Sequence, residues 1–87
     1  MGAYRLSIAN AVKQDVRNIE RAALDRILQK IRSLAEDPFP SGCRKLKGSS
    51  SSYRVRVGDY RIIYEVDSET RTVTVFHVRH RKDAYQK

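Results

Sequence analysis

The chain has 87 residues, and its 18 Lys and Arg against 10 Asp and Glu give a formal charge of +8, so we expect one domain, residues 1–87, with a polyanionic partner such as nucleic acid. Its 40% hydrophobic residues argue against disorder, and the N-terminus lacks a secretory leader, which leaves the cytoplasm as the expected location. One Cys and two His exclude an internal disulfide and provide no zinc ligand set, so no metal or other cofactor is expected.

The first half of the chain predicts one strand and two helices. Residues 4–8 alternate apolar and polar side chains, as a strand does. Apolar residues then recur at helical spacing, which predicts helices over residues 10–19 and 22–36, with Asn10 as the N-cap of the first. The DPFP segment at 37–40 ends the second helix, because proline lacks the backbone donor and restricts the residue before it.

The second half predicts a loop and three strands. Residues 41–52 combine turn-forming and basic residues, which is typical of a linker or of a mobile basic loop beside a binding surface. Strands are expected at 53–57 and 60–66, around a Gly-Asp pair that suits a type II′ turn, and at the Val- and Thr-rich 72–79. This order predicts an α+β fold, β-α-α-β-β-β, with both helices on one face of an antiparallel sheet.

The hairpin register gathers arginines on one side of the sheet. A two-residue turn sets Arg56 opposite Arg61, and opposite residues share a side. Alternation then gives the hairpin an apolar face, which packs on the helices, and an open face. The apolar face comprises Tyr53, Val55, Val57, Tyr60, Ile62, Tyr64 and Val66, and the open face comprises Arg54, Arg56, Arg61, Ile63 and Glu65.

The last strand is expected to extend this open face. Phe76 and Val78 are the expected core residues, although the opposite parity stays open. The residues sent to the open face are then His77, Arg79 and Arg81. Clustered like charges repel unless an anion binds them, and guanidinium groups fit phosphate oxygens, so we predict a phosphate-binding face. The alternative is an ordinary solvated strand face whose charge Glu65 partly neutralises.

A site of this kind could also cleave RNA. The ribose 2′-hydroxyl can attack the adjacent phosphate if one group takes its proton, cations stabilise the phosphoryl oxygens and an acid protonates the leaving oxygen. Arginines stay protonated and suit the second task. His80 and Tyr85 are the candidate bases, although His80 could be an exposed strand residue and Tyr85 an apolar plug near the terminus.

Three segments carry a resemblance to a known family. KLKG at 45–48, YRVRVGDYRIIYEV at 53–66 and VRHR at 78–81, followed by Tyr85, resemble the RelE toxins of the RelE/ParE superfamily. The resemblance implies a small ribonuclease-like fold, metal-independent cleavage of mRNA in the ribosomal A site, and a RelB-like antitoxin that wraps and blocks the toxin. It implies catalytic roles for Arg54, Arg56, Arg61, Arg81 and Tyr85, to which the chemistry adds His80. The further expected nucleic-acid contacts are Lys45, Lys47, Arg79 and Lys82.

The resemblance departs at the expected base. Family members have lysines where this chain has Arg54 and Arg56, and one of those lysines is the proposed base. Here proton removal shifts to Tyr85 or His80, the ribosome activates the RNA by positioning it, or the nuclease is weak or conditional. Two other functions stay open: a ParE-like inhibitor of DNA gyrase, against which the arginines and Tyr85 argue, and a basic RNA-binding module without catalysis.

Overall fold

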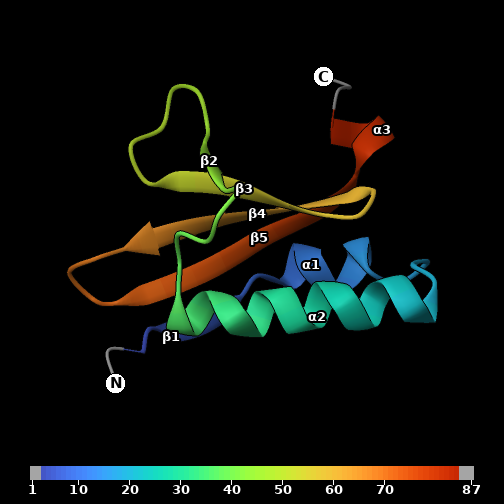
Figure 1. Ribbon diagram of the computed structural model, residues 1–87, viewed down its shortest axis with the longest axis horizontal. Helices are drawn as coiled ribbons and strands as arrows, with labels where there is room; N and C mark the ends of the chain where they lie inside the picture. Colours follow the sequence, from blue (N-terminus) through green and yellow to red (C-terminus); the bar gives the residue numbers. More distant parts are fainter. Residues whose placement is uncertain (1–2, 85–87) are drawn as a thin grey trace.

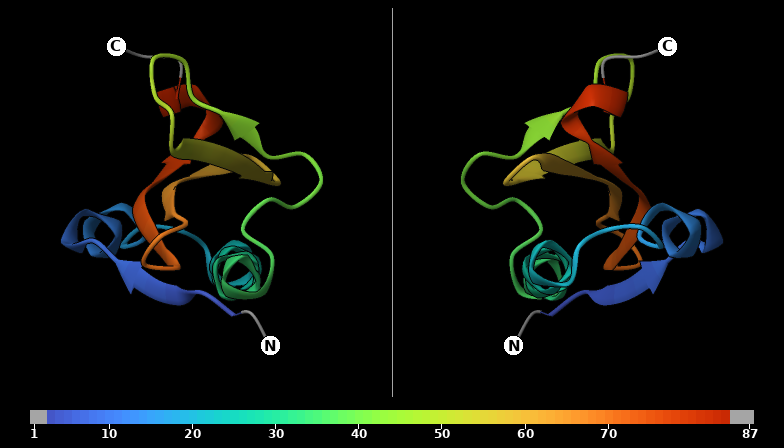
Figure 2. Two further views of the ribbon diagram at one scale, coloured as in Figure 1. Left: turned by 90° about the vertical axis from the view of Figure 1, so that its left-hand side faces the viewer. Right: turned by 90° about the vertical axis from the view of Figure 1, so that its right-hand side faces the viewer.

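The computed structural model describes residues 3–84, which form a five-stranded sheet with the two longer helices on one side (Figure 1). The elements in chain order are β1 (Arg5–Ile8), α1 (Asn10–Asp15), α2 (Arg21–Glu36), β2 (Arg44–Lys45), β3 (Ser52–Val57), β4 (Tyr60–Asp67), β5 (Thr72–His80) and α3 (Arg81–Ala84). Figure 2 shows α2 beneath the strands, with α3 and the segment around β2 on the opposite side. The predicted α+β fold class is confirmed. Within the described residues, no helix combines the length and apolarity that a membrane span requires.

The sheet is mixed, with the strand order β1-β5-β4-β3-β2. β1 runs parallel to β5, whereas the other neighbouring strands are antiparallel, so the expectation of an entirely antiparallel sheet is wrong for the first strand. Alternation within a strand carries no information about the direction of its partner. The predicted loop over residues 41–52 also contains the short edge strand β2, which pairs with β3.

The two long helical predictions have different outcomes. α2 matches the prediction closely and buries Ile27, Ile31 and Leu34, which share one side of a helix at this spacing. α1 ends at Asp15, four residues before the predicted end. Its N-cap is Ala9, not Asn10, and the Ala9 amide donates to the Val75 carbonyl at 2.9 Å. That bond to β5 fixes where the chain enters the helix.

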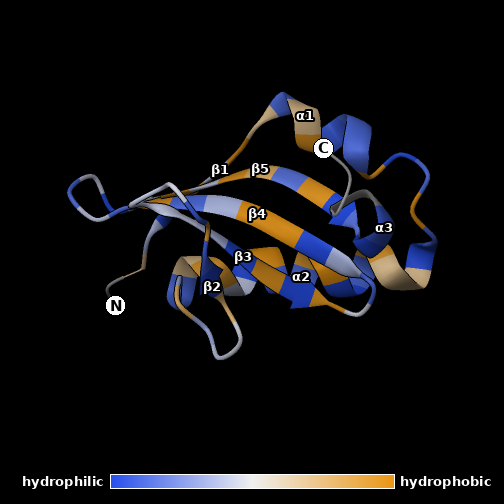
Figure 3. Cartoon of the chain, turned by 90° about the horizontal axis from the view of Figure 1, so that it is seen from above, coloured by the Kyte–Doolittle hydropathy of each residue, from blue (hydrophilic) through white to orange (hydrophobic). Residues whose placement is uncertain are grey.

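The β3–β4 hairpin has the predicted register. Arg56 stands opposite Arg61 and Val55 opposite Ile62, across a turn in which Gly58 has a φ of +58°. The expected apolar face is turned toward α2. Its buried members are Val55, Ile62, Tyr64 and Val66. The open face of the hairpin therefore lies on the side away from α2, as Figure 3 shows by the position of α2 beneath β3 and β4.

A β-bulge divides β5 into two halves of opposite parity. Val73 and Val75 are buried, but the register against β4 then shifts, and Phe76 has no partner. Val78 is buried again beyond the bulge. The core prediction is right for Val78 and wrong for Phe76, which is 37% exposed. The extra residue brings His77 onto the open face, as predicted, because it reverses the alternation that Val73 and Val75 begin.

A buried tyrosine anchors the chain between α2 and β2. The Tyr64 hydroxyl donates to the Pro38 carbonyl at 2.7 Å, and its ring stacks on Tyr53 at 5.9 Å between centroids. Phe39 packs edge-on against Tyr53. Burial raises the pKa of the Tyr64 phenol, so this group stays protonated and remains a donor. The hydrogen bond between Tyr64 and Pro38 fixes the segment that follows α2, and this segment reaches the open side of the sheet at Gly42.

Candidate nucleic-acid interface

A row of arginines crosses three neighbouring strands. Arg56 on β3 stands opposite Arg61 on β4, and Arg61 stands opposite Arg79 on β5. Opposite residues project to the same side of a sheet, so these three side chains share the side away from α2. We call this side, with the residues Arg44, Arg54, Arg56, Arg61 and Arg79, the arginine face.

The edge strand β2 adds a wall to the arginine face. Arg44 pairs with Arg54, which places both on the same side of the sheet. A hollow of about 300 Å³ lies there, lined by Gly42, Arg44, Arg54, Arg56 and Arg61. Gly42 has a φ of +92°, a conformation that side chains other than hydrogen rarely adopt, and it turns the chain into β2. The hollow is therefore lined mainly by residues that carry guanidinium groups.

The acidic groups near this surface leave most of its charge unbalanced. Glu65, which partly neutralises the face in the alternative interpretation, accepts a hydrogen bond from the Ser51 hydroxyl at 2.9 Å. Among the side chains that the structure describes, no carboxylate forms an ion pair with Arg54, Arg56 or Arg79. Facing arginines repel one another at this spacing, and a bound anion would relieve the repulsion. The arginine face is thus suited to phosphate groups.

The remaining predicted residues lie around this surface. Arg81 begins α3 beside the hairpin turn, where its amide donates to the Asp59 carbonyl at 2.7 Å and its guanidinium lies 4.0 Å from the Asp59 carboxylate. Lys47 and Lys82 are exposed. Lys45 pairs with Tyr53 and so shares the side of the apolar face, while its neighbour Arg44, absent from the predicted contacts, lies on the arginine face. Tyr85 lies outside the described residues.

His80, predicted as a candidate base, is separated from the arginine face. It stands opposite Tyr60, and the two rings meet edge to face at 5.1 Å. Tyr60 belongs to the apolar face of the hairpin, so His80 projects toward the helix side of the sheet. Its Nδ1 accepts the Lys82 amide at 3.2 Å. The strand alternation that brings Arg79 to the arginine face turns its neighbour His80 away.

His77 is the histidine that the strand places on the arginine face, opposite Ile63. Its Nδ1 lies 3.1 Å from the Asp15 carboxylate of α1, and its ring lies beside the Arg79 guanidinium. The predicted inward position of Val78 places His77 on this side, but it does not predict this contact. No local signal could identify Asp15 as its partner, because the two residues are 62 positions apart in the chain.

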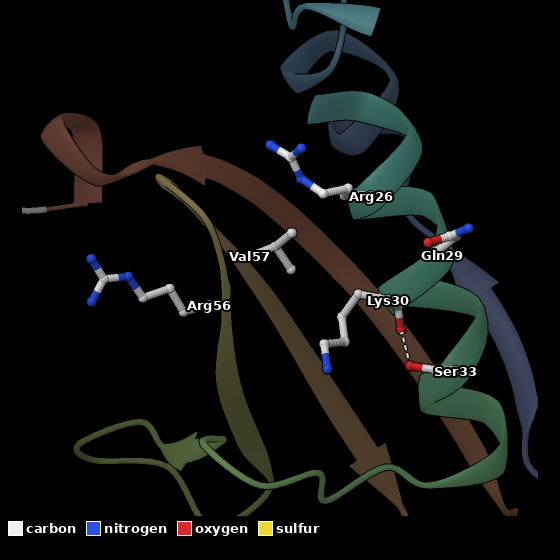
Figure 4. A pocket seen from close by; sticks show the side chains of 6 residues that line it. All are labelled: Arg26, Gln29, Lys30, Ser33, Arg56 and Val57. Carbon is white, nitrogen blue, oxygen red and sulfur yellow. Dashed lines mark hydrogen bonds between the residues drawn. The ribbon is translucent and has the colours of Figure 1, made fainter. Parts of the chain in front are cut away.

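Basic side chains continue around the exposed edge of β3. A groove of about 330 Å³ separates this edge from α2 and is lined by Arg26, Gln29, Lys30, Ser33, Arg56 and Val57. Figure 4 shows Arg26 and Lys30 extending from α2 toward β3, whereas Arg56 extends from β3 to the other side. Arg56 therefore borders both this groove and the arginine-lined hollow. The two basic surfaces are contiguous.

Comparison with known proteins identifies the family of this chain. Residues 6–85 match the family described as ParE toxin of type II toxin-antitoxin system, parDE. The chain belongs to this toxin family. The toxin is 28% identical over 86 residues to the putative toxin RelE1 of Methanocaldococcus jannaschii, with 95% of this chain and 96% of the relative covered.

Solved structures agree with this assignment. The toxin superimposes with a TM-score of 0.81 on a chain of the archaeal RelE–RelB complex from Pyrococcus horikoshii OT3, at 28% identity and with 91% of this chain and 96% of that chain covered. A chain of the E. coli RelBE complex shares the fold, with a TM-score of 0.76, 24% identity and 90% and 96% coverage. The protein is therefore a RelE-like toxin of a type II toxin–antitoxin system, as the sequence resemblance predicts.

Proposed function

We propose that the toxin is an endoribonuclease that cleaves mRNA in the ribosomal A site and so halts translation in the cytoplasm. The observation that carries this proposal is the row of Arg56, Arg61 and Arg79 on the arginine face. Three guanidinium groups on adjacent strands share one side of the sheet, and arginine binds phosphate oxygens bidentately. The RelE names of the relatives support the same reading.

The proposed reaction is an internal transfer within the RNA. The 2′-oxygen forms a bond to the adjacent phosphorus while the bond from phosphorus to the 5′-oxygen breaks, which leaves a 2′,3′-cyclic phosphate and a 5′-hydroxyl. One proton leaves the 2′-hydroxyl and one reaches the 5′-oxygen. Arg56 and Arg61 stabilise the negative charge that develops on the phosphoryl oxygens, and Arg54 holds the neighbouring phosphate. This scheme requires no metal.

Proton removal is the step that the arginines perform poorly. Arg54 and Arg56 remain protonated at neutral pH, so neither is an effective base. His80 lies on the helix side of the sheet and is not part of the proposed site. Tyr85 keeps the role that the resemblance implies, and the ribosome contributes by aligning the 2′-oxygen with the phosphorus, an effect that by itself lowers barriers substantially.

A cognate antitoxin of the RelB type is the proposed protein partner. The solved relatives from Pyrococcus horikoshii and Methanococcus jannaschii are described as complexes of RelE with RelB. The strongly positive toxin favours an acidic partner, and an amphipathic segment of that partner can occupy a groove of the domain. Co-expression of the toxin with acidic proteins from the same organism tests this proposal. One of these proteins should bind the toxin and restore growth, and failure of all of them to do so would contradict the proposal.

Reconstituted translation tests the nuclease. Purified toxin added to translating ribosomes should cut the mRNA, and mapping of the fragment ends should reveal 5′-hydroxyl termini at the A-site codon. Arg61→Ala should lower the cleavage rate by about 10²-fold, because one charge-stabilising group is lost. Arg32→Ala removes the same charge from an exposed position on α2 and should cleave normally. Intact mRNA at saturating toxin would overturn the proposal.

Inhibition of DNA gyrase is a second candidate, which the ParE description of the matched family favours. A gyrase inhibitor does not cleave RNA, so the arrangement of several arginines around one phosphate would have no role in its function. A supercoiling assay separates the two functions, because a gyrase inhibitor blocks supercoiling and leaves ribosome-bound mRNA intact. RNA binding that is sensitive to salt but yields no cleaved ends would instead identify a binding module without catalysis.

A further inference from the structure

Three side chains form a connected group at the edge of β5. The Asp15 carboxylate accepts the Val78 amide at 3.0 Å and lies 3.1 Å from His77 Nδ1. Arg79 Nη2 lies 3.3 and 3.4 Å from the two ring nitrogens of His77. The Asp15 side chain is 18% exposed and that of His77 is 35% exposed. The more buried Asp15 carboxylate therefore orients the His77 ring, and this ring is accessible to solvent and to a ligand.

The position of Asp15 determines which nitrogen of His77 faces outward. A carboxylate accepts hydrogen bonds, so His77 Nδ1 carries a hydrogen in either charge state of the ring. In the neutral ring, Nε2 is then an acceptor, and Arg79 Nη2 lies over the face of the ring, at nearly the same distance from both nitrogens. In the protonated ring, Nε2 becomes a donor. Protonation thus gives His77 and the adjacent Arg79 like charges, which repel each other.

The charged and titratable groups that the described residues place around His77 come from α1, β4 and β5, and they include His80, which lines a hollow with Asp15 and Arg79. α1 contributes Asp15, and β4 contributes the apolar Ile63 directly opposite, with Arg61 two positions along the strand. β5 itself contributes Arg79. The protonated histidine therefore lies between one inner anion and the cations of the arginine face. An oxyanion placed between His77 and Arg79 would receive hydrogen bonds from both and would relieve their repulsion.

We infer that His77, oriented by Asp15, joins Arg79 in its protonated form to bind one backbone phosphate of RNA, which makes this end of the arginine face a proton-dependent phosphate site. The inference rests on the proposed RNA function. It adds His77 as a phosphate-binding residue, a role that the sequence resemblance does not assign. Binding takes up one proton from solvent at His77 Nε2. The site should therefore hold RNA more tightly as the pH falls through the range in which histidine titrates.

Affinity measured against pH tests the site without the ribosome. The probe is a short single-stranded RNA that carries 2′-O-methyl groups throughout, so that it cannot be cleaved, and binding is followed by fluorescence anisotropy at low, constant salt. The unmodified toxin should bind about five- to tenfold more tightly at about pH 6 than at about pH 8, the range over which histidine changes charge. An oligonucleotide with uncharged methylphosphonate linkages should lose this dependence.

Four variants assign the dependence to His77. His77→Asn keeps an amide donor toward Asp15 but cannot titrate, so its affinity should change less than about twofold over this pH range. His77→Arg supplies a permanent charge and should bind tightly at both pH values. Asp15→Asn should weaken the dependence, with circular dichroism as the check on folding. His80→Asn changes the other histidine of the chain, on the helix side of the sheet, and should keep the full dependence.

Several results would overturn the inference. These are a pH dependence that survives in His77→Asn, a dependence that disappears in His80→Asn, and an unmodified toxin that does not bind the RNA at either pH. The fate of the proposed nuclease is separate. A toxin that leaves mRNA intact on the ribosome, yet shows a pH dependence assigned to His77, would retain the phosphate site and lose the cleavage function.

Discussion

A single buried hydroxyl connects the sheet to the segment that carries Arg44. Tyr64 is completely buried, and its hydroxyl donates to the Pro38 carbonyl at 2.7 Å. Pro38 is itself buried, so loss of this donor would leave its carbonyl without a described partner. Burial also raises the pKa of Tyr64. The protonated Tyr64 hydroxyl therefore contributes fully to stability below its pKa in the unfolded chain, about 10. This contribution is lost as the pH rises through the higher pKa of Tyr64 in the folded protein.

Tyr64→Phe should destabilise the toxin by about 1–2 kcal/mol at neutral pH, because a buried carbonyl loses its hydrogen bond. Urea unfolding followed by circular dichroism measures this change. Tyr53→Phe is the matched control, since Tyr53 stacks on the same ring and no hydrogen bond from its hydroxyl is described within residues 3–84. Equal stability of Tyr64→Phe and Tyr53→Phe would show that the bond to Pro38 contributes nothing. Arg44 also depends on this anchor for its place on the arginine face.

The β3–β4 hairpin is the element that aligns the arginines. Its turn holds Gly58 at a φ of +58°, and the two-residue turn length sets Arg56 opposite Arg61. A methyl group added at Gly58 would meet nothing closer than Arg26 Nη2 at 4.0 Å. The space is therefore open, and the cost of a side chain at this position comes from the backbone conformation alone.

Gly58→Ala should lower the free energy of unfolding by about 1–2 kcal/mol, because an L-residue is strained at this backbone conformation. Gly58→Asn should cost less, since asparagine tolerates positive φ better than other side chains. Urea unfolding of the two variants gives the comparison. An Ala variant as stable as the native chain would show that the turn relaxes to another type, and the pairing of Arg56 with Arg61 would then need to be determined again.

The hairpin also shows which features the sequence encodes locally. Register and facing residues of residues 53–66 follow from a two-residue Gly-Asp turn and period-two alternation, and both are confirmed, while the positive φ of Gly58 agrees with the predicted turn. The partner of β1 and the pairing of β2 depend on residues far along the chain, so local patterns miss them. The bulge at Phe76 has no signature in a run of Val and Thr. The pairing of β1 and β2 and the position of the bulge are determined by tertiary packing.

The candidate site divides in the same way. The sequence predicts the side of Arg54, Arg56 and Arg61 correctly because a single hairpin carries all three. Chemistry alone makes His80 a candidate base, but alternation along β5 turns it to the other side of the sheet. The contact between Asp15 and His77 joins α1 to β5 and could be found only from the fold. Residue type thus indicates candidate chemistry, whereas the sheet decides which candidates meet.

For the whole molecule, the proposed RNA function raises the question whether the net charge of +8 or its arrangement would govern binding. A positive net charge attracts any polyanion, independently of its sequence. If the arginine face contacts phosphates, it adds a second contribution, because each such contact displaces counterions. Only this second contribution depends on which arginines are removed.

Two double variants of equal charge separate these contributions. Arg56→Ala/Arg61→Ala and Arg21→Ala/Arg32→Ala each remove two arginines and lower the net charge from +8 to +6. If the arginine face binds RNA, the first pair should reduce the slope of log affinity against log salt by about 1.4, since each lost contact to single-stranded RNA removes about 0.7. The second pair, on the exposed surface of α2, should leave the slope nearly unchanged. Equal slopes for both pairs would mean that overall charge alone governs the interaction, and the arginine face would then have no special part in binding.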